Sequence, residues 1–165
     1  MVKGKGIDTM IRSLSLLNTK NFVFTVAGGG EEKESLKKLI KELKLTNKVR
    51  LIGWCKNVEK LYRKSDLFIH ASHQEGFPNS IVEALSFNLP VIASNCKGGT
   101  NEILINGKGG DLFPVNNHKL LASKIQRFID NQINLKKKLK FARKHINKYT
   151  VDNNYNKYMK VFNKV

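Results

Sequence analysis

Residues 71–92 read ASHQEGFPNSIVEALSFNLPVI, and this stretch decides how the chain is interpreted. Its pattern predicts the end of a strand, a loop, a short helix and the start of the next strand. Pro78 closes a turn that contains a glycine, and Asn79 or Ser80 can cap the helix that follows. The helix ends before Pro90. The stretch therefore predicts one β–α–β unit of a parallel sheet.

Two glutamates mark this unit, Glu75 in the loop and Glu83 on the first turns of the helix. Backbone N–H groups near Asn79, Ser80 and Ile81 are expected to lack internal partners and to carry the positive end of the helix dipole. Such a helix start suits a phosphate. The two carboxylates could accept hydrogen bonds from hydroxyls on either side of that phosphate. This arrangement predicts a nucleotide sugar as ligand, whereas a solvated Glu83 on a surface helix is the alternative.

Short apolar runs alternate with helical segments along the chain. Four strands are predicted, at residues 22–27, 49–52, 67–71 and 90–93. This alternation indicates an α/β fold, a three-layer doubly wound parallel sheet that binds ligands at the carboxyl ends of its strands. Gly53, Ser72 and Asn95 fall at such ends. We therefore expect the loops there to converge on one crevice with the Glu75 to Glu83 segment.

Apolar side chains recur at helical spacing in the remaining segments, while residues 106–110 are predicted as a flexible turn. The apolar faces are Ile7, Met10, Ile11, Leu14 and Leu17; Leu36, Leu39, Ile40 and Leu43; Val58, Leu61 and Tyr62; Leu120, Leu121, Ile125, Phe128 and Ile129; Leu135, Leu139 and Ala142; and Tyr155, Tyr158, Met159 and Phe162. The triple glycine at residues 28–30 is interpreted as turn chemistry, because it lacks the spacing of a phosphate loop.

The length of 165 residues predicts a single domain, residues 1–165, with a sizeable core. No apolar run is long enough to span a bilayer. Asp8 and Arg12 interrupt the first apolar positions, so a signal peptide is not expected and a cytoplasmic location is. Cys55 and Cys96 lack the spacing of a metal motif or a disulfide scaffold. We expect reduced thiols, with Cys96 in a packing role.

The net charge of +17 would attract nucleic acid, anionic lipid or a phosphorylated ligand. The densest basic run is Lys136 to Lys138 with Lys140, and no aromatic-interleaved RNA motif accompanies it. No specific nucleic-acid partner is therefore expected. A solvated basic face is one interpretation of this charge. Contact with the inner face of an anionic membrane is the other.

His70, His73 and Glu75 spell a metal-like pattern, but no metal site is expected. On a strand, His70 and His73 point to opposite faces because they are an odd number of residues apart. We predict a buried His70 and a His73 at the edge of the pocket.

A longer set of residues follows the pattern of a known family from Lys5 to Pro114. The matching positions are Lys5-Gly6 with Asp8, Val26-Ala27-Gly28 with Gly30, Leu51-Ile52-Gly53, Leu61-Tyr62, Ser65-Asp66, Ser72, Glu75-Gly76-Phe77, Glu83-Ala84, Pro90 to Ala93, Gly98-Gly99, Glu102-Ile103, Gly107 and Gly110. Their order and spacing resemble the donor-binding C-terminal domain of the retaining family-4, group-one glycosyltransferases. That family has the GT-B fold of two facing Rossmann-like domains.

The resemblance implies roles for individual residues. Lys5 would contact the diphosphate and Glu75 the hydroxyls of the donor sugar, as the two catalytic candidates, while Glu83 would bind the ribose. A disordered terminal lysine is the alternative for Lys5. Further donor contacts are expected from Gly53, Trp54, Gly76, Phe77, Asn79, Ser80 and Ile81, with the base near Gly53 and Trp54. No cofactor is implied, since the nucleotide sugar is a substrate.

The resemblance also implies a missing N-terminal acceptor domain. The family has a strand and a Gly-Arg pair before the position of Lys5, and residues 150–165 would form a terminal helix that crosses to that domain. We expect this helix to expose its aromatic face and the isolated fragment to be inactive. The expected reaction moves a hexose or N-acetylhexosamine from a UDP-sugar to a glycan or polyprenyl-linked acceptor, in O-antigen or lipopolysaccharide biosynthesis.

Three other functions fit parts of the pattern. A sugar-nucleotide epimerase shares the two-domain fold and could use the same two glutamates. A glycoside hydrolase also uses two carboxylates, but it needs both in one open cleft that flanks a glycosidic bond. A basic Rossmann-like module that binds nucleic acid would show a steep dependence on salt.

Overall fold

Strands and helices alternate along the chain in the computed structural model, which describes residues 1–19, 21–149, 153 and 159. The elements are α1 (Ile7–Ser15), β1 (Phe24–Ala27), α2 (Lys33–Glu42), β2 (Val49–Gly53), α3 (Val58–Arg63), β3 (Phe68–His70), α4 (Asn79–Ser86), β4 (Val91–Ser94), α5 (Thr100–Ile103), β5 (Asp111–Phe113), α6 (His118–Asp130), α7 (Ile133–Ile146) and the 3-10 turn η1 (Asn147–Tyr149). This order confirms the predicted α/β class.

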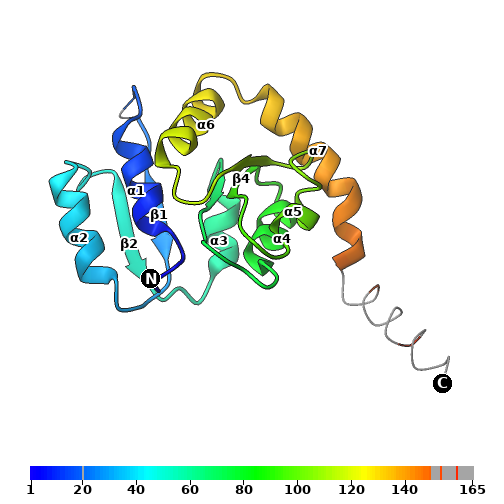
Figure 1. Ribbon diagram of the computed structural model, residues 1–165, viewed down its shortest axis with the longest axis horizontal. Helices are drawn as coiled ribbons and strands as arrows, with labels where there is room; N and C mark the ends of the chain where they lie inside the picture. Colours follow the sequence, from blue (N-terminus) through cyan, green and yellow to red (C-terminus); the bar gives the residue numbers. More distant parts are fainter. Residues whose placement is uncertain (20, 150–152, 154–158, 160–165) are drawn as a thin grey trace.

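The strands pair in parallel, as predicted, but the hydrogen-bonded strands form two ladders. One ladder holds β1 and β2, and the other has the order β3-β4-β5. Phe24 lies opposite Val49 in the first, and His70 lies opposite Ala93 in the second. Within the residues that the structure describes, no ladder joins β1 to β3. The prediction of a single sheet is therefore corrected to two parallel pieces (Figure 1).

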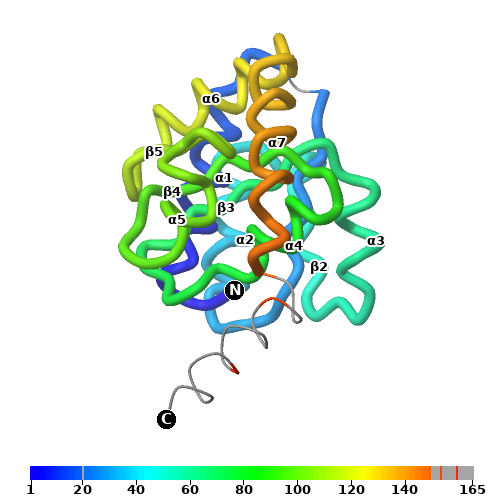
Figure 2. The backbone as a smooth tube through the Cα atoms, turned by 90° about the vertical axis from the view of Figure 1, so that its right-hand side faces the viewer, coloured from blue at the N-terminus to red at the C-terminus, as the bar shows by residue number. Residues whose placement is uncertain are grey.

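One core joins the two ladders. It takes Val26 from β1, Val49 from β2 and Ile92 from β4, and α1 adds Ile11, which is fully buried. Figure 2 shows α1 and α6 side by side, and both contribute to this core. A second cluster forms where α4 and α7 pack together beside β4. The carboxyl ends of β1 and β3 are therefore held over one shared core.

Several predicted boundaries differ from the structure. The first strand begins at Phe24 and the third ends at His70, and the turn after residue 106 leads into β5, which the apolar pattern did not reveal. Strand β5 is too short to show an alternating pattern of its own. In α6, Leu120 and Ile129 are exposed, although both were predicted to face inward. They flank the buried stripe of Leu121, Ile125 and Phe128 on a helix that is covered on one side only.

The predicted terminal helix falls mostly on residues that the structure leaves undescribed. Tyr155, Tyr158 and Phe162 lie outside the described residues, as do residues 150–152. The expected aromatic face and its crossing to another domain therefore stay predictions. Among the described helices, none is both long and apolar enough to cross a membrane.

Candidate active site

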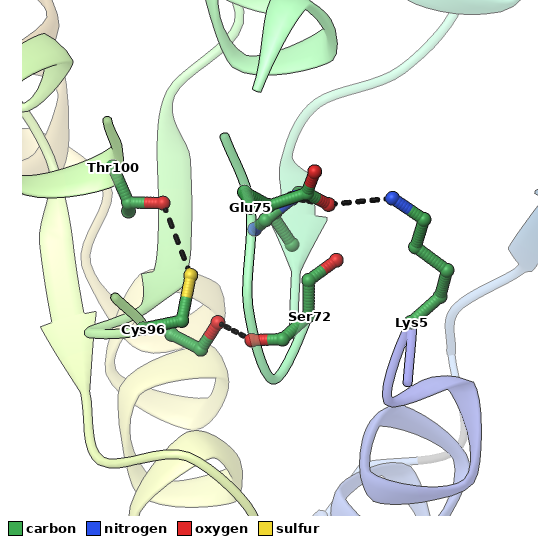
Figure 3. Close-up of polar contacts among 7 residues, drawn as sticks. Lys5, Ser72, Glu75, Cys96 and Thr100 are labelled. Atoms are coloured by element: carbon green, nitrogen blue, oxygen red, sulfur yellow. Dashed lines mark hydrogen bonds and ion pairs between the residues drawn. The ribbon is translucent and has the colours of Figure 1, made fainter. Parts of the chain in front are cut away.

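Lys5 and Glu75 meet at the carboxyl end of β3. The Lys5 Nζ atom lies 2.7 Å from Glu75 Oε1, and the two side chains come from loops 70 residues apart in the sequence (Figure 3). The loop before α1 approaches β3 closely, since the His73 N–H donates to Gly4 O at 2.8 Å. A Cβ atom on Gly6 would lie 2.1 Å from Ala71 O, so only glycine permits this approach. The structure thus brings both predicted catalytic candidates together.

His70 also contacts the Glu75 carboxylate. Its Nε2 atom lies 3.2 Å from Glu75 Oε1, and the ring is buried at the end of β3, as predicted. His70 Nδ1 has no hydrogen-bond partner among the described residues. Among the described residues, no group of three His, Cys, Asp or Glu side chains is placed to hold a metal ion. His70 therefore interacts with the Glu75 carboxylate through its Nε2 atom.

The pKa values of these groups are shifted by burial and by each other. Burial lowers the pKa of His70 below its ordinary value of 6.5, although Glu75 acts in the opposite direction. Burial alone would raise the pKa of Glu75, but hydrogen bonds from Lys5 and Ser72 and the charges of Lys5 and His70 outweigh it and lower that pKa. At neutral pH, Glu75 is a carboxylate that faces a charged ammonium and a neutral imidazole.

The burial of His70 predicts that the free energy of unfolding falls when the pH drops below 6.5. The unfolded chain binds a proton on His70 at higher pH than the native protein, so the free energy of unfolding decreases by at most about 1.4 kcal/mol per pH unit from this group. The contribution of Glu75 is lost only below its ordinary value of 4.5. His70→Phe should remove the slope between pH 6.5 and 5 in urea unfolding. His73→Phe, at an exposed position, is the control. An unchanged slope in His70→Phe would refute the assignment.

The loop that carries Glu75 is hydrogen bonded to the loop after β4. The Glu75 N–H donates to Lys97 O at 3.1 Å, and the Gly99 N–H donates to Gly76 O at 3.0 Å. Gly98 has φ +115°, and a Cβ atom there would lie 1.5 Å from Glu75 O. Neither Gly98 nor His70 was predicted to have a role at the site. The glycine pair after a buried strand was the available signal for Gly98, whereas nothing local linked His70 to Glu75.

Buried polar groups also make contacts within the loop that carries Glu75 and the loop after β4. Ser94 Oγ donates to Ser72 O at 2.6 Å, and Cys96 Sγ lies 3.4 Å from Thr100 Oγ1. Figure 3 shows these contacts beside Lys5 and Glu75. Cys96 is buried, which agrees with its predicted packing role.

Glu83 lies on α4 and has a different partner from Glu75. Its Oε2 atom accepts a hydrogen bond of 2.9 Å from the hydroxyl of Tyr62, a buried residue of α3. Burial, together with the hydrogen bond to Glu83 and its charge, raises the pKa of Tyr62. The Tyr62 ring stacks on Phe87 with centroids 5.5 Å apart. Glu83 is exposed, yet one of its oxygens accepts a hydrogen bond from a buried neighbour.

The start of α4 differs from the prediction. Pro78, not Asn79 or Ser80, occupies the N-cap position, and no side chain caps the helix. The Asn79 N–H donates to Phe77 O and the Ile81 N–H donates to Pro78 O, both at 3.0 Å. The tight turn at Pro78 thus satisfies two of the three amides that were expected to be free. Within the described residues, only the Ser80 N–H of the three has no backbone partner.

The other expected donor contacts lie at strand ends or loops. Gly53 has φ +70° and ends β2, where its carbonyl accepts from the Gly28 N–H at 2.6 Å. Trp54 follows with 83% of its surface exposed. Phe77 is exposed as well, and its ring lies edge-on to Tyr149 with centroids 5.2 Å apart. Trp54 therefore follows directly after β2, whereas Phe77 lies in the loop between β3 and α4.

Comparison with known proteins places this chain among enzymes that transfer sugars. A family model described as "Glycosyl transferases group 1" matches residues 1–147. An uncharacterised glycosyltransferase of Methanocaldococcus jannaschii is 42% identical over 106 residues, which cover 63% of this chain and 26% of that protein. The Staphylococcus aureus poly(ribitol-phosphate) alpha-N-acetylglucosaminyltransferase is 28% identical over 166 residues, 99% of this chain and 34% of that enzyme. The chain thus spans about a quarter to a third of the length of these relatives.

Solved structures share the fold. The Anabaena protein HepE, crystallised with UDP, superposes with a TM-score of 0.91 at 23% identity, over 98% of this chain and 46% of that one. The structure of TarM superposes with a TM-score of 0.86 at 27% identity, over 99% of this chain and 33% of that one. These likenesses agree with the Rossmann-like half of a GT-B fold. Since the family model covers residues 1–147 and the architecture agrees with it, this chain belongs to the group 1 glycosyltransferase family.

Proposed function

We propose that this domain binds the nucleotide-sugar donor of a retaining glycosyltransferase, and that the donor is a UDP-sugar carrying a hexose or N-acetylhexosamine. The observation that carries the proposal is the contact of Lys5 with Glu75 at the carboxyl end of β3. Parallel α/β sheets bind their ligands at this edge. The crystallised complex of HepE with UDP, from a protein of the same fold, supports the choice of base.

The chemistry of sugar transfer explains the pair. The diphosphate gains negative charge as it leaves, so a preorganised cation beside it stabilises the transition state. Lys5 is half exposed and can turn from Glu75 toward a phosphate, while Glu75, only 15% exposed, keeps a fixed place. The freed carboxylate then accepts hydrogen bonds from sugar hydroxyls. In this role Glu75 positions the sugar and Lys5 neutralises the leaving group.

Glu83 is proposed to bind the ribose. Tyr62 donates to Oε2, which leaves Oε1 and the remaining lone pairs for a pair of hydroxyls. The Ser80 N–H, near the same helix start, is the backbone donor proposed for a phosphate.

The acceptor is proposed to be a glycan or a lipid-linked saccharide of a bacterial surface polymer. One relative is the Campylobacter jejuni N-acetylgalactosaminyltransferase that acts on a diphospho-undecaprenol substrate, 32% identical over 78% of this chain and 35% of that enzyme. An Escherichia coli relative is named for O-antigen biosynthesis. On α7, exposed Lys136, Lys137, Lys140 and Lys144 would attract an anionic membrane where such acceptors reside. Peripheral attachment is part of the proposal.

Calorimetric titration with UDP, GDP and UDP-sugars tests the proposal. We expect one nucleotide to bind and Glu83→Ala to weaken both the nucleotide and its sugar by about tenfold, as expected for one lost charged hydrogen bond. Glu59→Ala is the matched control, because Glu59 lies on α3 and pairs with Arg63 at the surface. Binding that is unaffected by Glu83→Ala would refute the ribose role. Salt-steep binding of any DNA, with no nucleotide binding, would refute the donor domain.

A further inference from the structure

A cavity of about 220 Å³ lies between α6 and α7, two helices that follow each other along the chain (Figure 1). Asp111, the first residue of β5, is part of its lining. Strands β3, β4 and β5 run in parallel, so the amino end of β5 and the carboxyl end of β3 lie at opposite edges of this ladder. Since Lys5 and Glu75 meet at the carboxyl end of β3, the cavity is separate from the proposed donor site.

The charges that line this cavity are mostly positive. Helix α6 contributes Lys124 and Arg127, helix α7 contributes Lys137 and Lys138, and the carboxylate is that of Asp111. The side chains of Lys124 and Asp111 are each only 15% exposed. Four cations against one carboxylate leave a net positive charge in the cavity. Such an excess of charge in a partly enclosed space attracts anions.

Contacts with Asp111 explain only part of this positive charge. The Lys138 Nζ atom lies 2.6 Å from Asp111 Oδ1, so this lysine ties α7 to β5. The Lys124 Nζ atom lies 3.9 Å from Asp111 Oδ2, which is a long distance for an ion pair. Arg127 and Lys137 form no ion pair with any residue that the structure describes. A role in joining α7 to the sheet therefore accounts for Lys138 but not for Arg127 or Lys137.

The surroundings of these cations favour a bound anion. Lys124 and Arg127 are three residues apart on α6, a spacing at which side chains are neighbours and like charges repel. Phe128 and Leu135 are buried and add apolar surface to the lining. Apolar surroundings lower the local dielectric constant and so strengthen the attraction between a cation and an anion. An anion held between the two helices would offset the repulsion.

We propose that this cavity, the α6–α7 anion site, binds the phosphate group of a phosphate ester, which is either a soluble molecule or the headgroup of an anionic lipid. A phosphate offers several acceptor oxygens, and the planar guanidinium of Arg127 can donate to two of them at once. Asn131 and Asn134 also line the cavity, and their amides can hydrogen bond to the rest of the ester. The site shares no residue with the proposed donor site, so either can exist without the other.

Titration with inorganic phosphate at constant ionic strength, followed through backbone amide signals in NMR spectra, tests the site. We expect saturable shifts at Asn131 and Asn134, which line the cavity. Phosphate that binds at the proposed donor site would instead shift the amides of Gly76 and Ser80. The two sets of signals therefore report on the two sites separately. The absence of saturable shifts at Asn131 and Asn134 would overturn the proposal.

Two double variants separate a site from diffuse charge. Arg127→Gln with Lys137→Gln should weaken phosphate binding at the cavity by about tenfold. Lys119→Gln with Arg143→Gln is the matched control, because it also removes one arginine and one lysine, one from each helix, and neither residue lines the cavity. All four side chains are exposed, so both variants should fold. The control should change binding by less than about twofold. Equal weakening in both variants would overturn the proposal.

Asp111→Asn is expected to have the opposite effect on binding. Loss of the carboxylate charge leaves Lys124 and Lys138 free to interact with phosphate, so its affinity should rise by about fivefold. Urea unfolding shows whether the variant is folded. In a folded Asp111→Asn protein, unchanged or weaker binding would contradict the site.

Vesicles of phosphatidylglycerol and phosphatidylcholine, with pure phosphatidylcholine as control, distinguish the two sources of the phosphate. If a lipid headgroup occupies the site, Arg127→Gln with Lys137→Gln should weaken vesicle binding more than Lys119→Gln with Arg143→Gln does. If the ligand is soluble, the two double variants should bind vesicles equally, while only the first loses affinity for inorganic phosphate.

Discussion

Gly98→Ala is expected to lower the free energy of unfolding by about 3 kcal/mol and to displace Glu75 from Lys5. The new Cβ atom would lie 1.5 Å from Glu75 O, and the backbone at φ +115° disfavours any side chain. The clash is with backbone that hydrogen bonds on both sides, so the loop cannot shift cheaply. Urea unfolding at pH 7 measures the loss.

Gly29→Ala is the matched control for this substitution. Among the described residues, a Cβ atom on Gly29 would have nothing beyond its chain neighbours within 4 Å, and Gly29 has no positive φ. Its replacement should change stability by less than about 1 kcal/mol, with a stabilising sign, because alanine restricts the unfolded chain. If Gly98→Ala and Gly29→Ala behaved alike, the contact between the loops would have no energetic weight.

Glu75→Gln is expected to weaken binding of the UDP-sugar by about thirtyfold, or 2 kcal/mol, while binding of UDP changes little. The reason is that the proposed role of Glu75 concerns sugar hydroxyls alone, and its charge is what strengthens those hydrogen bonds. Glutamine keeps the shape of the side chain, so the buried surroundings of His70 and Ser72 are retained. Calorimetry with both ligands separates this effect from that of Glu83→Ala, which should weaken both.

Lys5→Met and the double variant complete the measurement. If Lys5 binds the diphosphate, Lys5→Met weakens UDP and the UDP-sugar alike. The double-mutant cycle then reports how strongly the ion pair in the free protein couples the two residues. A loss in Glu75→Gln that is the same for UDP as for the UDP-sugar would contradict a sugar-binding role.

The alternation of elements was predictable because each depends on local periodicity. Val26, Val49 and Ile92 lie in apolar runs long enough to identify strands, and the spacing of Ile7, Met10 and Ile11 identifies α1 without tertiary information. Boundaries were less certain. Strand β5 has three residues, and the exposure of Leu120 depends on how far α6 is covered. Neither the existence of β5 nor the exposure of Leu120 could be predicted from the local sequence pattern.

The candidate site was predictable only in part. The two glutamates and Lys5 could be named from their pattern, but their partners could not. Lys5 and Glu75 lie 70 residues apart, and His70 was expected to be merely buried. The expectation of free amides at Asn79 and Ile81 was wrong, because both N–H groups donate to backbone carbonyls of the turn at Pro78.

The sequence by itself determined the class of fold, the parallel direction of the strands and the loop that carries Glu75, since these follow from side-chain periodicity and from the residues that turns require. Only the tertiary structure decided that Lys5 meets Glu75, that Gly98 must lack a side chain and that the sheet is divided between β1 and β3. Periodicity indicates which face of an element is buried. Which edges and loops then meet depends on packing across the whole chain.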